Sequence, residues 1–299
     1  MPINAVVPEL VFTIVAAATI FTVMFEVGLG IELGEFRWIW RHPALVARAL
    51  FSVLIAVPAL ALIVARALDL PREADIGIVL MAISPGAPVA LRRSLGAGGH
   101  HAFAPALQIL LAVLAVASMP LSVAGLNEVY AGHASISPAH LAPQVFVAQL
   151  LPLALGMLAR RTMPLHAARF EPMLYRLGTV LLVLLLVLAL IDVWRVVIDA
   201  GPRVAFAIAV TTALALGVGH LLGGPEVGTR TAVAISSAAR NAGLALLVAT
   251  LNSAAPEIVK TVLVYLVVSA ITIIPYVMWR RRAAPPSTAT PSVPSQPRA

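Results

Sequence analysis

Arg240 has the clearest potential for chemistry, because it lies in the small, apolar segment AISSAARNAGLAL (residues 234–246) with no acid nearby in sequence. A guanidinium donates hydrogen bonds, accepts none and keeps its charge, so it suits an anionic ligand. Ser236, Ser237 and Asn241 flank it and could add further donors. These four residues are therefore candidate substrate-binding residues for a small organic anion.

A structural role is the alternative for Arg240. It would then pair with an acid such as Glu26, or cap backbone carbonyls that are freed by a helix break at Pro85. If the segment spans a membrane, burying this charge costs about 2.5–3.5 kcal/mol on insertion scales, so the charge needs a compensating role. Glu26 itself is either the partner of a nearby arginine or a proton-coupling carboxylate.

A second group of candidates belongs to or follows the stretch IGIVLMAISPGAPVALRRSLGAGG, residues 76–99. Ser84 could donate to a substrate or bind a carbonyl of its own helix. Gln108 stands alone among apolar residues, so we expect it to line the same site rather than face lipid. Arg92 and Arg93 either reach that site or mark the cytoplasmic end of the helix.

The sequence lacks the residues that several other functional classes require. It has no cysteine, and its seven histidines show no metal-ligand spacing, so we expect no metal and no cofactor. Paired carboxylates or a histidine dyad at helical spacing, which a membrane enzyme would need, are also missing, so we expect no enzyme. The net charge of +7 comes from arginines confined mostly to short connections, which indicates membrane orientation rather than a nucleic-acid surface.

Transmembrane helices are the elements that would position these residues. The chain is 61% hydrophobic and 11% charged, whereas soluble domains carry roughly 25% charged residues. A helix crosses the hydrocarbon core in about 20 residues. We therefore predict an all-α polytopic membrane protein with nine transmembrane helices, near residues 7–29, 44–65, 75–96, 102–125, 141–159, 177–199, 203–223, 231–251 and 256–279.

The distribution of Lys and Arg predicts how the chain is oriented. With the N-terminus outside, thirteen of these residues fall on the cytoplasmic side and five fall outside. This bias favours an outer N-terminus and a cytoplasmic C-terminus, in a bacterial inner membrane. We expect residues 1–281 to form the membrane domain and the Pro-, Ser- and Thr-rich residues 282–299 to form a disordered tail.

Two of the predicted spans differ from the rest. Pro85, Gly86 and Pro88 interrupt the third span, because proline removes a backbone donor. The eighth span is rich in Ala, Ser and Gly, and both spans contain Ala-Ile-Ser, at 82–84 and 234–236. Interrupted helices in matching positions of two halves indicate the binding site of a transporter, since broken backbone survives in lipid only where protein or a cavity surrounds it.

The chain resembles the bile acid:sodium symporter (BASS) family in three stretches, MFEVGLGIELGEFRWIWRHP (24–43), GIVLMAISPGAPVAL (77–91) and RTAVAISSAARNAGLAL (230–246). The resemblance implies two inverted five-helix repeats in which two discontinuous helices cross at the substrate and cation site. Here the first repeat, about residues 7–126, would lack its opening helix. The second repeat would cover about residues 139–281, which gives four plus five helices.

The positions that hold sodium in this family are altered. Where the resemblance places a Glu and a Gln in the eighth span, this chain has Ser236 and Arg240, although the adjacent asparagine is kept as Asn241. Sodium requires a shell of oxygen ligands, and an arginine supplies none. We therefore expect the family's sodium sites to be absent. The other ligand positions fall on Val53, Ala90, Leu91, Ala104 and Gln108.

These observations predict a secondary transporter that moves a small organic anion by alternating access. Arg240 would supply the positive charge that sodium supplies in similar proteins. One alternative is a proton-coupled carrier that uses Glu26, and another is a non-transporting sensor or subunit with the same fold. The lipid bilayer is the remaining partner that the composition indicates.

Overall fold

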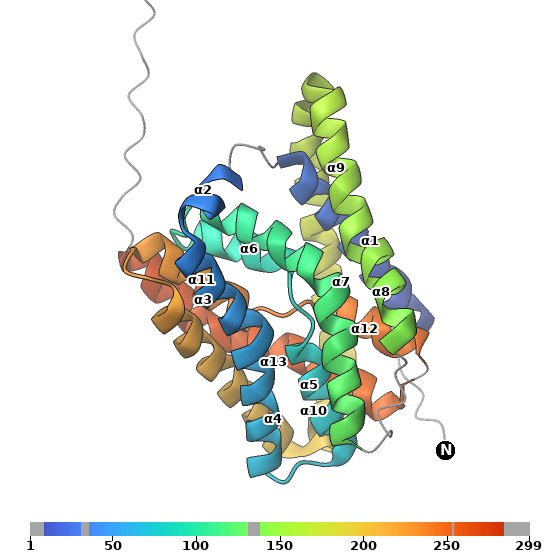
Figure 1. Cartoon of the computed structure of the whole chain (residues 1–299). Helices are drawn as coiled ribbons and strands as arrows, with labels where there is room; N and C mark the ends of the chain where they lie inside the picture. The colour runs from blue at the N-terminus through green and yellow to red at the C-terminus, as the bar shows by residue number, and fades with distance from the viewer. Residues whose placement is uncertain (1–8, 31–35, 131–137, 253, 284–299) are drawn as a thin grey trace, which may run out of the picture.

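The protein is built from helices, with no β-strand among the residues that the computed structural model describes, which are 9–30, 36–130, 138–252 and 254–283 (Figure 1). The tail predicted from residue 282 lies outside this part from residue 284 onward. In chain order, the elements are α1 (Glu9–Gly30), α2 (Phe36–Arg41), α3 (Pro43–Phe51), the π-helix η2 (Ser52–Ala56), α4 (Val57–Ala67), α5 (Arg72–Ala82), α6 (Pro88–Gly96), α7 (Phe103–Val129), α8 (Pro138–Val145), the π-helix η3 (Phe146–Leu150), α9 (Leu151–Thr162), α10 (Pro164–Leu222), α11 (Val227–Ala238), α12 (Ala242–Leu251) and α13 (Pro256–Ala283).

Eight helical segments of the described residues are long and apolar enough to cross a membrane. The third predicted span is not among them, because its break divides it into α5 and α6, of 11 and 9 residues. The sixth and seventh predicted spans are joined as α10, which is interrupted at Gly201, where φ is 79° and ψ is 158°. The structure confirms an all-α polytopic membrane protein, while nine spans and the inverted repeat stay predictions.

Two interrupted helices meet inside the molecule. Residues 83–87 leave the helix between α5 and α6, and Gly86 takes a φ of 74°, which glycine adopts without strain. α6 then begins at Pro88, whose missing N–H is not needed in a first helical turn. The eighth predicted span is broken in the same way between α11 and α12. The two breaks touch, since the backbone N–H of Asn241 donates to the carbonyl of Ser84 over 3.0 Å.

Two helix groups pack around these breaks. α1 and α9 lie side by side in Figure 1, and the early part of α10 joins them, whereas the later part of α10 packs against α11 and α13. The closest approach is between α1 and α9. A Cβ atom on Gly156 would lie 2.2 Å from the carbonyl oxygen of Phe25, and one on Gly28 would lie 2.2 Å from that of Leu153. Small residues let helix backbones approach this closely in membranes, so glycine is needed here.

We predict that Gly156→Ala destabilises the protein by about 1–3 kcal/mol, because the added methyl group forces α9 away from α1. Gly217→Ala is the matched control, since a Cβ atom there would meet nothing within 4 Å. That variant should be neutral or slightly stabilising, because alanine favours helix. The free energy of unfolding in detergent, measured for both variants, checks this; equal effects would show that the α1–α9 contact does not require glycine.

Candidate functional site

Arg240 lies in the break between α11 and α12, within the most buried candidate span. In the segment Val227–Leu251, 94% of an 18-residue window is buried inside the protein, and only 4% of Arg240 is exposed. Its Nη1 donates to the carbonyl of Val53 over 3.0 Å. Its Nε and Nη2 have no hydrogen-bond partner among the described residues. The guanidinium therefore points into the protein beside the crossing, not into lipid.

No carboxylate compensates the charge of Arg240 among the described residues. Glu26 binds Arg92 instead, with Oε2 and Nη2 2.6 Å apart. Pairing of Arg240 with Glu26, the alternative considered from the sequence, is therefore wrong, because Arg92 of α6 occupies the carboxylate. The other described ion pairs are Arg66–Asp75, His100–Glu226 and Arg160–Glu171.

The π-helix η2 supplies the carbonyl that Arg240 binds. A π-helical turn departs from the regular helical hydrogen-bond ladder and is frequent at functional sites. Val53 accepts from Arg240 within this turn. The Oγ of Ser52, the adjacent residue, lies 2.8 Å from the Oγ of Ser237 in α11. These two contacts hold η2 against the second break, so Arg240 caps a carbonyl here rather than at the Pro85 break.

Two buried hydroxyl groups extend the polar surroundings of Arg240. Tyr265 of α13 lies close enough to interact with the guanidinium electrostatically and is fully buried. Its hydroxyl lies close to that of Thr212 in α10.

Asn241 has a clear role in holding the crossing together. Its Oδ1 accepts from the N–H of Leu244 over 3.1 Å, which caps α12. Its Nδ2 donates to Oε1 of Gln149 in η3 over 3.3 Å. The Nε2 of Gln149 is buried without a partner. Because a Cβ atom on Gly86 would lie 2.5 Å from this Nε2, the free amide group sits directly against the first break.

The remaining predicted polar residues fall into three settings. Ser84 donates its hydroxyl to the carbonyl of Leu80 over 2.7 Å, so it bonds back to the end of α5. Gln108 donates to the carbonyl of Gly86 over 2.7 Å, which places it at the crossing and satisfies a carbonyl freed by the break. Ser236 is 6% exposed, and its side chain forms no hydrogen bond with the described residues.

The unsatisfied polar atoms at the crossing favour an anion. Nε and Nη2 of Arg240 and Nε2 of Gln149 are donors that cannot accept a hydrogen bond. A cation would find little to replace its hydration shell, since Ala90 and Ala104, at two family ligand positions, are buried methyl groups. No group of three or more His, Cys, Asp and Glu side chains in the described part of the chain has a metal-binding arrangement.

Sequence reasoning missed three residues of this site, which are Ser52, Gln149 and Tyr265. Each is a polar side chain with apolar residues on both sides, as in FSVLI, VFVAQLL and VLVYLVV. The same signal led to Gln108. Applied to every predicted span, it would have marked all three as candidates, but not which way their side chains point.

Arg92 connects the first broken helix to two other helices. Besides Glu26 of α1, it binds α10, where Nη1 donates to Oγ1 of Thr179 over 2.8 Å. Its guanidinium lies 4.2 Å from the ring centre of Tyr175. Arg93 points elsewhere and lines a pocket beside α13. The described contacts bring neither arginine to Arg240.

A model of the sodium bile acid symporter family matches residues 17–200. The chain is also 25% identical over 271 residues to YocS of Bacillus subtilis (strain 168), named as an uncharacterized sodium-dependent transporter, and the match covers 85% of this chain and 81% of that protein. The matched family region contains Glu26, Arg92 and the first break, whereas Arg240 lies beyond it.

We predict strong coupling between Glu26 and Arg92. Each of Glu26→Gln and Arg92→Gln leaves a largely buried charge unpaired. The variant that carries both substitutions should therefore lose about 0.5–3 kcal/mol less unfolding free energy than the sum of the losses in the two single variants. The half-buried pair Arg160–Glu171, at 3.7 Å and more exposed than Glu26–Arg92, is the matched control and should couple by at most about 1 kcal/mol. Unfolding free energies of both cycles provide the measurement. Equal coupling in the two pairs would contradict the view that Glu26 and Arg92 form a buried ion pair that holds α1 and α6 together.

Proposed function

Because the chain belongs to the sodium bile acid symporter family and is a membrane transporter, we propose that it carries a small organic anion by alternating access. Arg240 would hold the anion at the crossing of the two broken helices. The proposal includes the orientation predicted from the arginine bias, with an outer N-terminus and a cytoplasmic C-terminus in a bacterial inner membrane.

One observation carries this proposal, namely that Nε and Nη2 of the buried Arg240 find no acceptor among the described residues. A buried donor left unsatisfied costs about 1–3 kcal/mol, and more when it is charged. A carboxylate or sulfonate would remove this penalty, since its oxygens match the planar fork of a guanidinium. Nε2 of Gln149 is available as a further donor beside the first break.

The broken helices add a favourable field for the same ligand. α6 begins at Pro88 and α12 begins at Ala242, both next to a break. Helix N-termini carry partial positive charge, which attracts anions. Discontinuous helices that meet at a substrate site are a recurring arrangement in secondary transporters.

Alternating access would require the two helix groups to move relative to each other. Arg92 binds Glu26 in α1 and Thr179 in α10, so it links the first broken helix to the group formed by α1, α9 and the early part of α10. Asn241 makes a comparable link to Gln149 in η3. We propose that these contacts open and re-form as the site turns from one side of the membrane to the other.

The proposed coupling differs from that named for YocS. Arg240 stands, by resemblance, where the family places a sodium ligand, so the positive charge near the substrate is permanent. The buried methyl groups of Ala90 and Ala104 at two other ligand positions support this view. Anion binding would then need no sodium.

We predict that Arg240→Met abolishes anion binding without destabilising the protein. Methionine has similar length, and removing an unpaired buried charge should leave the unfolding temperature unchanged or raise it. The measurement is a thermal-shift screen with small mono- and dicarboxylates and sulfonates, followed by counterflow of the best anion in proteoliposomes.

Two controls sharpen this experiment. Arg161→Met changes an exposed arginine at the end of α9 and should keep both binding and counterflow. Arg240→Lys keeps a charge but loses the fork, so it should bind more weakly than the wild type. Counterflow that survives Arg240→Met would refute the role of Arg240, and binding without counterflow in the wild type would indicate a non-transporting protein.

We also predict that the best anion from this screen raises the unfolding temperature of the protein equally in sodium and in N-methylglucamine buffers. The reason is that the guanidinium replaces the charge of a bound ion. The same titration at equal ionic strength in the two buffers checks this. An effect seen only in sodium would contradict the built-in charge and would restore sodium coupling.

A further inference from the structure

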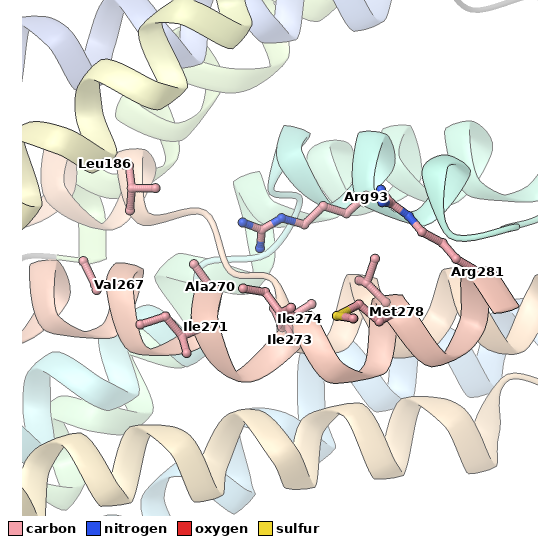
Figure 2. Close-up of a pocket in the computed structure, with 10 residues that line it drawn as sticks. Arg93, Leu186, Val267, Ala270, Ile271, Ile273, Ile274, Met278 and Arg281 are labelled. Atoms are coloured by element: carbon pink, nitrogen blue, oxygen red, sulfur yellow. The ribbon is translucent and has the colours of Figure 1, made fainter.

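A pocket of about 430 Å³ lies between α6, α10 and α13, and Arg240 is not among the residues that line it. Figure 2 shows its composition. Apolar side chains of α13 form one wall, Leu186 of α10 lies across from them, and two arginines contribute the charge. These are Arg93 of α6 and Arg281 near the end of α13.

The two arginines give the pocket an uncompensated positive charge. Arg93 forms no hydrogen bond or ion pair with the described residues, and in Figure 2 its side chain extends over the apolar row of α13. Arg281 donates only its Nε, to the carbonyl of Gly96 over 2.9 Å, so its terminal nitrogens remain available. Among the residues that the structure describes, no acidic side chain lines the pocket.

The apolar wall is open on the outside of the bundle. Ile271, Ile274 and Met278 are 61%, 51% and 49% exposed, although all three lie on one membrane-spanning helix. Side chains of this size on a membrane span are in contact with hydrocarbon. An acyl chain would therefore fit along this wall and enter from the bilayer.

The charged end of the pocket lies at the height of lipid headgroups. α13 ends at Ala283, directly after three arginines, and the exposed Trp279 stands one turn before its end. Tryptophan and arginine at a helix end mark the membrane–water interface. Arg280 is already bound to Thr231 and to the carbonyl of Val227. Arg281, with Arg93, is thus free to bind a headgroup.

We propose that this pocket binds an anionic phospholipid. The lipid phosphate lies between Arg93 and Arg281, and one acyl chain follows Ile271 and Ile274 of α13. Basic pockets between membrane helices are suited to such headgroups, and the apolar wall selects a lipid over a small free anion. α6 and α13 lie beside the crossing, whereas Leu186 belongs to the early part of α10, which packs with α1 and α9. The bound lipid therefore contacts both the helices of the crossing and the group formed by α1, α9 and the early part of α10.

The test is a thermal-unfolding titration of the full chain in detergent with phosphatidylglycerol, phosphatidylcholine or inorganic phosphate. Phosphatidylglycerol should raise the unfolding midpoint by about 5 °C at a hundredfold excess over its dissociation constant, and the other two should not. The double variant Arg93→Gln/Arg281→Gln should lose this lipid-specific increase. Arg161→Gln/Arg169→Gln, which removes the same charge from two exposed arginines, should keep it.

A second variant tests the apolar wall without changing charge. Ala270→Phe fills the pocket and should also remove the increase with phosphatidylglycerol, even if the double variant folds poorly. An equal increase in the wild type, the double variant and Ala270→Phe would overturn the proposal, as would an increase produced by inorganic phosphate alone. Arg240→Met should retain the lipid effect, so failure here and failure of the proposed anion site are distinguishable.

Discussion

The buried charge of Arg240 is the constraint on which the arrangement of the site depends. A guanidinium that is 4% exposed has lost nearly all of its hydration, and no carboxylate of the described residues replaces it. The fold offers partial compensation through the carbonyl of Val53 and through the C-terminal end of α11, which carries partial negative charge. Two donor nitrogens are left over, and an anionic ligand would complete their coordination.

Three arginines close to the first or second break illustrate how surroundings determine role. Arg92 is neutralised by Glu26 and bound to α10, so its charge holds helices together. Arg93 has no hydrogen-bond or ion-pair partner in the described part of the chain and faces an apolar pocket that opens toward lipid. Arg240 is enclosed without an acid from the described residues. The same side chain thus serves an ion pair, a proposed headgroup contact and a proposed substrate site.

Much of the architecture could be predicted from the sequence, because its signals are local. Pro85, Gly86 and Pro88 break a helix wherever they occur in a span, and the structure places a break there. The break beside Arg240 has a weaker signal, because it rests on an Ala-, Ser- and Gly-rich stretch and a repeated Ala-Ile-Ser rather than on proline. Ser52, Gln149 and Tyr265 were missed because a single polar residue in an apolar stretch does not reveal which way it points.

The sequence by itself determined the membrane class, the approximate spans and the presence of a cation in a span without a nearby acid, since composition and helix length depend only on neighbouring residues. The tertiary structure alone decided which charges meet. Glu26 binds Arg92, 66 residues away, while Arg240 binds a carbonyl 187 residues away. Such pairings depend on how helices pack, and packing is a property of the whole bundle that no local pattern contains.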